Sequence, residues 1–359
     1  MRGVWGLISR QWFLLALVLS LAIGFGLTDA VRPLAASSVV RSMLTASVLF
    51  LMGLTLQADS IRRNLRSPGP SLLAIGVNVL LVPLLALPAL WLLSPEMAGG
   101  LIVTSLVPST LASAAVWTRK AGGDDAAAMV VSVVTNLACF LVAPIGLWLI
   151  LGRFTEISPR DQVVSLLLWV VIPMVLGQVV RRIALEKWAT SQRNRLSTLA
   201  QIGILVMVCF GSVASADRMA GRVESGAGEI VAVGAMAISV HVVAFALAIA
   251  AARAIHAPPS GQIAVAISGS QKTLMVGLQI GLDFGVSILP MIIYHVGQLM
   301  IDTVIVQHWA KRYPAESLAG GSQGGEVARR AASVTSRENS VETEPNDAIA
   351  ALKKRDPGV

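Results

Sequence analysis

Long apolar runs with few or no charges constrain this chain more than any other feature of its sequence. Residues 71–93, 126–151, 230–252 and 288–306 form four such runs. Runs of about 20 residues predict membrane helices, and these do not alternate apolar with polar residues as outer-membrane strands do. Hydrophobic residues make up 55% of the 359 residues and charged residues 13%, which is more apolar surface than a soluble domain needs. The sequence therefore predicts an all-α polytopic membrane protein.

The remaining apolar segments raise the predicted number of transmembrane helices to ten. The predicted spans are residues 12–27, 42–56, 71–93, 100–118, 126–151, 163–180, 196–214, 230–252, 261–282 and 288–307. If both termini are cytoplasmic, 21 of the 28 Lys and Arg residues lie on the inner side, six on the outer side, and Lys272 within a span. This excess follows the positive-inside rule. We therefore predict a multi-pass protein of the cell (inner) membrane with both termini in the cytoplasm.

The net charge and the first apolar run each have an alternative interpretation. The net charge of +8 is explained by basic loops between spans, so no nucleic-acid partner is predicted. The first apolar run follows Arg2 and Arg10 and has the features of a cleaved signal peptide. Its cleavage would leave an odd count of nine spans, and we favour a retained first span.

The spans divide into two sets of five, in residues 1–155 and 156–310, followed by residues 311–359. Five crossings bring the chain to the opposite side of the membrane, so the second set must be inverted relative to the first, as in many secondary transporters. The last segment is rich in Gly, Ser, Glu and Ala and has no aromatic residue after Pro314. This composition is typical of disorder, and we predict a disordered cytoplasmic tail.

The fourth and ninth spans occupy corresponding places in the two sets, and polar residues interrupt both. The sequence "PST" at 108–110 interrupts the fourth span, and "GSQKT" at 269–273 interrupts the ninth. A helix that stops within the membrane leaves unpaired backbone groups, and paired interruptions point to a midplane binding site. Single hydroxyl residues are also common as packing contacts between membrane helices. The candidate binding residues in or near the two interruptions are Asn78, Ser109, Thr110, Ser113, Ser132, Thr135, Asn136, Ser270, Gln271, Lys272 and Thr273.

Several segments resemble the bile acid:sodium symporter superfamily. They are "STLASAAVWTRKAGGDDAAAMVVSVVTNLACFLVAP", "GSQKTLMVGL", "PMIIYHVGQLMIDTVIV", "FLMGLTLQADSIRRNLRSP" and "IPMVLGQVVRR". They are most similar to its SBF-like cation/proton antiporter-like branch, which includes the seventh member of human solute carrier family 10. The resemblance covers about residues 11 to 310. It implies ten spans in two inverted repeats, a panel of spans 1, 2, 6 and 7, and a core in which the unwound fourth and ninth spans cross.

The resemblance also implies where coupling ions would bind. Sodium-coupled members use a Ser-Asn pair in the fourth span, hydroxyls in the fifth, and a Glu and a Gln in the ninth. Here Ala114 follows Ser113 in place of the Asn, and Ser132 keeps only one of the two hydroxyls. Gln271 matches the Gln, but no Glu precedes it and Lys272 follows it. These departures predict altered sodium sites, so either sodium or a proton is the candidate coupling ion.

Lys272 is the least expected residue in a membrane span, because a buried Lys costs about 2.5–3.5 kcal/mol on insertion scales. Three functional roles are open. Its ammonium takes the place of a coupling sodium by bonding freed carbonyls, carries a coupling proton, or binds an anionic solute. The structural alternatives are an ion pair with Asp302 or Asp283 and an ammonium group that reaches a water-filled cavity.

The last span contributes His295, Gln298 and Asp302 to the candidate site. Tyr294, His295 and Gln298 match the family motif of that span, and Asp302 follows His295 by seven residues, on roughly the same helix face. We expect His295 to join a proton relay or only to bond a neighbouring backbone group. His241 in the eighth span has no such support and is predicted to be structural.

These features predict a secondary active transporter that moves a small solute by alternating access. Family analogy makes the solute an organic anion, and no organic cofactor, metal cluster or catalytic residue is predicted. Two other classes remain open. One is a membrane sensor or scaffold that acts through the tail. The other is an intramembrane enzyme in which Ser268 or Ser270 is the nucleophile and Lys272 the base.

Overall fold

The computed structural model describes residues 2–56, 68–111, 113–152, 158–220 and 227–312. All the regular elements of these residues are helical, which confirms the predicted all-helical class. Apart from residues 311 and 312, the predicted disordered tail lies outside the described residues.

The helices are given in chain order for the described residues. Three π-helical segments are marked η. The elements are α1 (Arg2–Gly26), α2 (Thr28–Ala36), α3 (Ser38–Thr55), α5 (Gly69–Gly76), η1 (Val77–Leu81), α6 (Val82–Ala86), α7 (Ala89–Leu92), α8 (Pro95–Leu106), α9 (Ser113–Lys120), α10 (Asp125–Leu151), α11 (Pro159–Leu166), η3 (Leu167–Val171), α12 (Ile172–Val180), η4 (Arg181–Leu185), α13 (Glu186–Ser191), α14 (Arg193–Ala220), α15 (Ala227–Ala254), α16 (Pro259–Ser270), α17 (Leu274–Asp283) and α18 (Leu289–Arg312).

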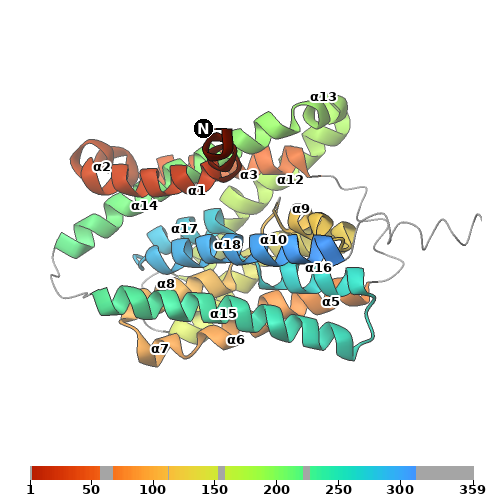
Figure 1. Cartoon of the computed structure of the whole chain (residues 1–359). Coiled ribbons are helices and arrows are strands. Elements are labelled where there is room, and N and C mark those ends of the chain that lie inside the picture. The colour runs from red at the N-terminus through yellow and green to blue at the C-terminus, as the bar shows by residue number, and fades with distance from the viewer. Residues whose placement is uncertain (1, 57–67, 112, 153–157, 221–226, 313–359) are drawn as a thin grey trace, which may run out of the picture.

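These helices form two groups, and each group combines segments that lie far apart in the sequence (Figure 1). In one group α1, α2 and α3 pack on α14, and α12 packs on α3. The other group contains α5, α6, α8, α10, α15, α16 and α18, with α16 packed on α15, α5 and α10. Helix α17 belongs to the second group and reaches α3 and α14 of the first. Helix α17 therefore forms one of the contacts between the groups, and α10 forms another through α11 and η3.

Seven described helical segments are long and apolar enough to cross a membrane. The bent pair Trp12–Gly26 and Thr28–Ala36, with an angle of 99°, adds an eighth if it counts as one span. The fourth and ninth predicted spans are missing from this set because each is divided into two short helices. Helices α8 and α9 have 12 and 8 residues, and α16 and α17 have 12 and 10. The predicted interruptions of both spans agree with these helix bounds.

The first interruption has a local cause in the sequence. Helix α8 ends at Leu106, and Val107 is extended with ψ of 157°. A proline disfavours the helical conformation of the residue that precedes it, so Pro108 ends α8 before Val107. The second interruption has no proline. Gln271 and Thr273 are extended, with ψ of 143° and 139°, and contacts from other helices hold them.

The segment of residues 181–195, predicted as a basic loop between two spans, is mostly helical. It contains η4, α13 and the start of α14. Arg181 is buried, and its guanidinium donates to Leu54 O at 2.8 Å and to Thr190 Oγ1 at 3.1 Å. The Arg181 guanidinium therefore bonds a carbonyl at the C-terminal end of α3. The count of Lys and Arg residues in loops does not predict this contact.

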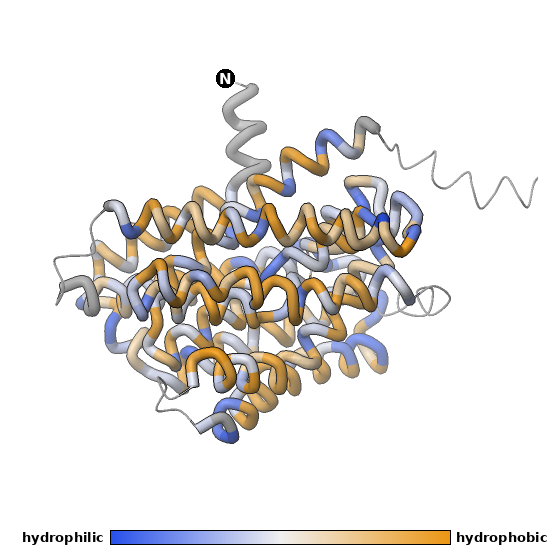
Figure 2. The backbone as a smooth tube through the Cα atoms, turned by 90° about the horizontal axis from the view of Figure 1, so that it is seen from below, coloured by the Kyte–Doolittle hydropathy of each residue, from blue (hydrophilic) through white to orange (hydrophobic). Residues whose placement is uncertain are grey.

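The outer surface of the helices is apolar, as lipid contact requires. Trp91 is 76% exposed, Ile183 79% and Val304 69%. Figure 2 shows hydrophobic residues along most of the helices and hydrophilic residues mainly toward their ends. Exposed side chains of this kind would be unfavourable in water but match a bilayer. The structure is therefore that of a multi-pass membrane protein.

Helices α3 and α12 come unusually close because each carries a glycine at the contact. A Cβ atom added at Gly53 would lie 2.4 Å from Met174 O, and one at Gly177 would lie 2.4 Å from Phe50 O. Both clashes would be with backbone atoms, which cannot rotate away. Small residues allow this close approach between membrane helices.

Replacing Gly177 by Ala should therefore destabilise the protein, because α12 must move away from α3. Overpacking of this kind costs about 1–3 kcal/mol, so we expect the melting temperature in detergent to fall by several degrees. Gly76→Ala is the matched control, since a Cβ at Gly76 meets nothing within 4 Å. Equal melting temperatures for the two variants would show that the contact is not tight.

Candidate functional site

The two interrupted segments contact each other directly. The Thr273 N–H donates to Pro108 O at 2.9 Å, and the Ser109 hydroxyl donates to Ser268 O at 2.7 Å. All four residues lie in or beside the two breaks, and Ser109 and Ser268 are fully buried. The breaks therefore supply part of each other's missing hydrogen bonds, as backbone groups inside a membrane protein must do.

Helix α10 provides hydrogen-bond partners for the backbone of the first break, between α8 and α9. The Ser132 hydroxyl donates to Thr110 O and the Asn136 amide donates to Ser109 O, both at 2.8 Å. The Ser109 N–H donates to the Thr135 hydroxyl oxygen at 3.2 Å. Residues 132, 135 and 136 share one helix face. The three polar side chains on this face of α10 therefore all bond the break between α8 and α9.

Asn78 and Gln298 satisfy the second break. The Asn78 amide donates to Gly269 O and Gln271 O, each at 3.0 Å. Gln298 accepts from the Lys272 N–H with Oε1 and donates to Lys272 O with Nε2, both at 2.9 Å. The Gln298 amide thus pairs with both backbone groups of Lys272 and replaces the helical bonds that the break removes.

The Lys272 ammonium is 1% exposed and lies among oxygen atoms. It donates to Asn78 O at 2.6 Å, to Val107 O at 2.9 Å and to Asn78 Oδ1 at 3.2 Å. An ammonium group has three donors and no acceptor, so these three oxygens satisfy it. The contacts join α8, η1 and the second break through a single positive charge.

The Asn78 carbonyl is free for this contact because of a proline on the same helix. In η1 the Val82 N–H bonds to Val77 O, five residues earlier. In that register the partner of Asn78 O would be residue 83, which is Pro83 and has no N–H. The π-helical turn and the proline together leave an unpaired carbonyl next to the break.

The ion pair of Lys272 with Asp302 or Asp283, one of the structural alternatives, is not formed in the described part of the chain. No ion pair links Lys272 to a described carboxylate, whereas Asp283 pairs with Arg41 at 3.3 Å and Asp302 contacts His241. The reason is geometric. The side chain of Lys272 extends toward Val107 and η1, and α18 contacts the backbone of Lys272 instead.

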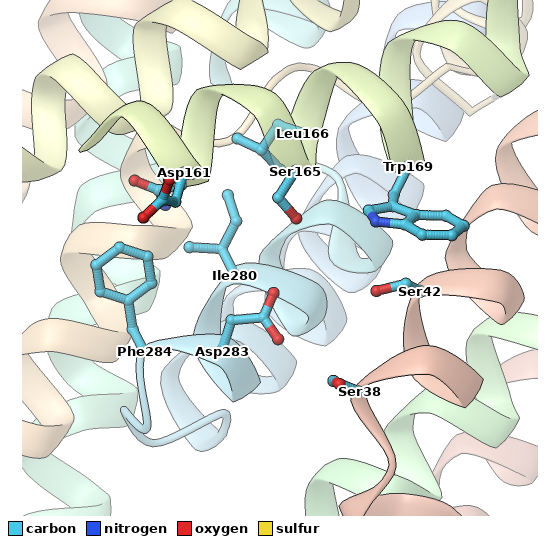
Figure 3. A pocket seen from close by; sticks show the side chains of 10 residues that line it. Ser38, Ser42, Asp161, Ser165, Leu166, Trp169, Ile280, Asp283 and Phe284 are labelled. Carbon is cyan, nitrogen blue, oxygen red and sulfur yellow. The ribbon is translucent and has the colours of Figure 1, made fainter. Parts of the chain in front are cut away.

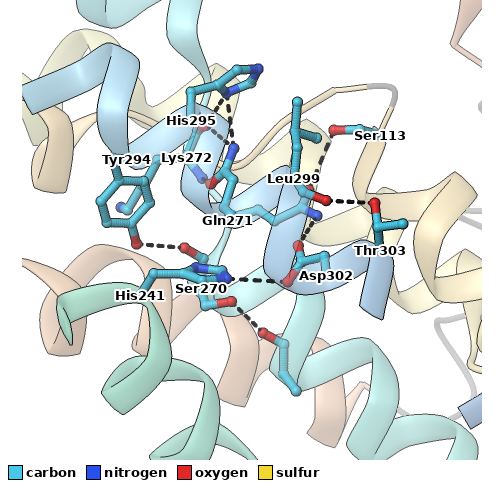
Figure 4. Close-up of polar contacts among 12 residues, drawn as sticks. Ser113, His241, Ser270, Gln271, Lys272, Tyr294, His295, Leu299, Asp302 and Thr303 are labelled. Atoms are coloured by element: carbon cyan, nitrogen blue, oxygen red, sulfur yellow. Dashed lines mark hydrogen bonds and ion pairs between the residues drawn. The ribbon is translucent and has the colours of Figure 1, made fainter. Parts of the chain in front are cut away.

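Asp302 contacts the side chain of Gln271 and not that of Lys272 (Figure 4). Its Oδ1 lies 3.1 Å from His241 Nε2, and its Oδ2 accepts from Gln271 Nε2 at 2.5 Å. His241 and Asp302 are both fully buried. Sequence reasoning set His241 aside as structural. The available signal was a histidine inside an apolar span, which is a functional candidate by default in a membrane.

His295 lies apart from Asp302. Its Nδ1 accepts from Gln298 Nε2 at 2.9 Å and lies 3.4 Å from Lys272 O. The predicted shared helix face with Asp302 therefore does not bring the two side chains into contact. Of the two roles expected for His295, the contacts are those of a residue that orients Gln298 beside the break.

Ser270 and Thr273 contribute mainly through their backbones. The Ser270 hydroxyl donates to Ala266 O at 2.7 Å within α16, while its carbonyl accepts from the Tyr294 hydroxyl at 2.8 Å. Tyr294 was not among the predicted site residues, although its hydroxyl bonds the second break. The available signal was the match of Tyr294 to the family motif of the last span.

The Ser-Lys arrangement of an enzyme is not formed. The Ser268 hydroxyl donates to Ala264 O at 2.6 Å, and the Ser270 hydroxyl also bonds within α16. The Lys272 ammonium points away from both, toward Asn78 and Val107. A nucleophile and its base must lie within hydrogen-bond reach of each other, and these groups do not.

A cavity of about 840 Å³ opens between the two helix groups. Trp12 and Phe13 of α1 line one side, and Ser113 and Trp117 of α9 line the other. Lys120 also lines it, with its ammonium 4.7 Å from the centre of the Trp117 ring. The Ser113 hydroxyl donates to Gln271 Oε1 at 3.3 Å, so the cavity wall is joined to the crossing.

A smaller recess of about 320 Å³ lies at another contact between the groups and is lined by Ser42, Trp169 and Asp283 (Figure 3). A polar chain closes the contact beside it. Arg41 pairs with Asp283 at 3.3 Å, Gln279 donates to Asp283 at 2.7 Å, and the Thr45 hydroxyl donates to Gln279 at 2.8 Å. These bonds tie α3 to α17.

Comparison with known proteins covers most of the chain. A model of the SBF-like CPA transporter family matches residues 11–311. The probable sodium/metabolite cotransporter BASS4 of Arabidopsis thaliana chloroplasts is 28% identical over 324 residues, covering 85% of this chain and 73% of that protein. The sodium/bile acid cotransporter 7-A of Xenopus laevis is 23% identical and covers 56% and 61%. The sodium-dependent transporter YocS of Bacillus subtilis is 28% identical and covers 48% and 53%.

Proposed function

Because the chain belongs to the SBF-like CPA transporter family, we propose that it is a secondary active transporter whose solute crosses by alternating access at the contact between the two breaks. The family consists of transporters and not enzymes, and relatives carry the names of sodium/metabolite and sodium/bile acid cotransporters. The membership confirms the resemblance found in the sequence. The spanning helices and the buried polar crossing support the same role.

We propose a topology of ten spans in two inverted repeats, residues 1–155 and 156–310. It places both termini in the cytoplasm and the protein in the inner membrane. The seven uninterrupted spans, the bent pair of α1 and α2, and the two divided spans support this count. In this topology the group of α1, α3, α12 and α14 is the panel, and the remaining spans form the core. The inner excess of Lys and Arg supports the sidedness.

The two contacts between the groups suggest which side is open. In the proposed topology Lys120 marks the inner side and Arg41 the outer side. The 840 Å³ cavity lies beside Lys120, whereas the chain from Arg41 to Thr45 closes the contact beside Asp283. We infer an inward-open state in which the solute binds between Trp12, Trp117 and Ser113.

We propose that the Lys272 ammonium stands where sodium-coupled relatives would hold a coupling ion. The observation that carries this proposal is the set of three oxygens, Asn78 O, Asn78 Oδ1 and Val107 O, around one buried ammonium. A fixed positive charge at this point holds the two breaks together without a bound ion. Sodium at this position is then unnecessary for solute binding, and a proton remains the alternative coupling ion.

The solute is proposed to be a small organic anion with an apolar body. Aromatic side chains line the cavity, and Lys120 supplies a positive charge at its wall. An apolar lining with few polar groups is typical of sites for organic molecules. The relatives named for bile acids and metabolites are consistent with this class.

Accumulation of solute by proteoliposomes tests the proposal. Full-length protein is reconstituted and incubated with a defined mixture of dicarboxylates, 2-oxoacids, amino acids and bile acids, and the retained compounds are measured by mass spectrometry. We expect at least one anionic compound to accumulate above empty liposomes. A chain that ends at Tyr313 should keep this activity. Activity that depends on residues 314–359 would instead favour a scaffold or sensor.

A further inference from the structure

We propose that Asp302, oriented by His241, sets the direction of a buried hydrogen-bond chain that makes Ser113 a hydrogen-bond acceptor toward the cavity. Asp302 and His241 are then positioning residues, and the transported solute brings a donor group to Ser113. This inference rests on the proposed function, because it names the chemistry of the solute in the same cavity.

The chain begins at a group that can only accept. Asp302 is fully buried on α18, and its Oδ2 lies 2.5 Å from Gln271 Nε2. A carboxylate has no hydrogen to give, so the NH₂ group of Gln271 must face it. The carbonyl oxygen of the same amide is therefore forced to face the opposite way, toward α9 (Figure 4).

The amide oxygen then dictates the next two bonds. Gln271 Oε1 lies 2.6 Å from Thr110 Oγ1 and 3.3 Å from Ser113 Oγ. An amide oxygen only accepts, so both hydroxyls must donate to it. The Thr110 oxygen also accepts from the Ala114 N–H at 3.0 Å, and Thr110 is buried and does not line the cavity.

Ser113 differs from Thr110 because it lines the 840 Å³ cavity. A serine hydroxyl has one hydrogen and two lone pairs, and its hydrogen is committed to Gln271. Only lone pairs remain for a molecule in the cavity. A solute hydroxyl, amide N–H or ammonium group is therefore favoured beside Ser113, and a carboxylate there is disfavoured. The anionic group of the solute would sit near Lys120 instead.

His241 holds the first member of the chain. Its Nε2 lies 3.1 Å from Asp302 Oδ1, and both side chains are buried between α15 and α18. In Asp302→Asn the same His N–H would retain the amide oxygen of the new side chain. The NH₂ group of Asn would then face Gln271 and reverse its amide. Ser113 would accept from Gln271 and turn its hydrogen toward the cavity.

The test compares two neutral probes with the same aromatic body, 2-naphthamide and N,N-dimethyl-2-naphthamide. Both carry a carbonyl acceptor, but only the first has N–H donors. Their dissociation constants are measured by equilibrium dialysis on full-length protein in detergent. The ratio of the two constants is compared between the native protein and each variant. Micelle partitioning of the probes and a general loss of structure then cancel from the comparison. Neutral probes also avoid the charge change that the substitution makes.

The native protein should favour the probe with N–H donors. Asp302→Asn should lower that preference by about threefold to tenfold, the worth of one hydrogen bond. Ser113→Ala should lower it by a similar factor, and adding Asp302→Asn to Ser113→Ala should change nothing further, because the effect passes through Ser113. Ser212→Ala is the control, since its buried hydroxyl bonds only within α14.

The inference would be overturned if Asp302→Asn left the ratio of the two dissociation constants unchanged. It would also be overturned if Asp302→Asn changed that ratio equally in the native chain and in the Ser113→Ala chain. If Asp302→Asn does not give a folded, monodisperse protein, Ser113→Ala decides alone, and a loss equal for both probes would refute it. Absence of probe binding by protein that still accumulates solute would remove the cavity and this inference but leave transport standing. Absence of any accumulated solute would remove the proposed function itself.

Discussion

The Lys272→Gln variant should gain a sodium-dependent rise in melting temperature that the native protein lacks. In the native protein the ammonium satisfies Asn78 O, Asn78 Oδ1 and Val107 O. The shorter, neutral Gln side chain cannot reach all three, and each buried acceptor left unpaired costs about 1–3 kcal/mol. In choline chloride the variant should therefore melt several degrees below the native protein.

Sodium should recover much of that loss. A cation that enters the vacated oxygen cluster binds only the folded state, and a ligand at 100 times its dissociation constant stabilises by about 2.7 kcal/mol. The measurement is the melting temperature in sodium chloride and in choline chloride at equal ionic strength. Lys120→Gln serves as the matched control, because it also removes one lysine charge but leaves the oxygen cluster filled.

Two outcomes would contradict the proposed role of Lys272. Sodium that stabilises the native protein would mean that an ion site persists beside the ammonium, and the lysine would then be structural or would face the solute. A variant that melts lower but ignores sodium would mean that the oxygens do not form an ion site. In both cases the coupling ion must be sought elsewhere.

Cross-linking α3 to α17 should stop transport completely and reversibly. Thr45 and Gln279 are joined at 2.8 Å across the two helix groups, at the contact proposed to open toward the outside. In a chain with Cys139 and Cys209 replaced by Ala, we would introduce Thr45→Cys and Gln279→Cys and add a short bifunctional methanethiosulfonate, which joins the two thiols through reducible disulfides. Uptake by proteoliposomes should disappear after cross-linking and return after reduction, because alternating access needs the groups to separate.

The single variants Thr45→Cys and Gln279→Cys, treated in the same way, control for modification without a cross-link. They should keep their uptake after treatment. Full uptake by the cross-linked double variant would show that α3 and α17 do not separate during transport. The inward-open assignment would then have to be abandoned, although the chain would remain a transporter of this family.

The general character of the site was predictable from local patterns. Pro108 after an apolar run predicts a helix end, and the polar stretch from Gly269 to Thr273 predicts a second one. The expected side chains of Ser132, Asn136 and Asn78 bond these breaks, whereas the Ser270 hydroxyl bonds within its own helix. A polar group inside an apolar span has few ways to be satisfied other than such a break.

The partners of the buried charges were less predictable. Lys272 was expected either to bond freed carbonyls or to pair with a carboxylate, and only the fold distinguishes the two. Asp302 was expected near His295 because of their spacing, but it contacts His241 of α15. Helical spacing reports which residues share a face. It says nothing about which other helix lies against that face.

The sequence by itself determined the membrane class, the helical fold class, the two breaks and the family. These properties depend on composition and on residues adjacent in the chain, such as apolar runs and a proline that cannot continue a helix. Only the tertiary structure decided which oxygens surround Lys272, why Arg181 is buried, and which way the amide of Gln271 faces. Those outcomes depend on contacts between residues far apart in the sequence, and packing selects among partners that are chemically equivalent.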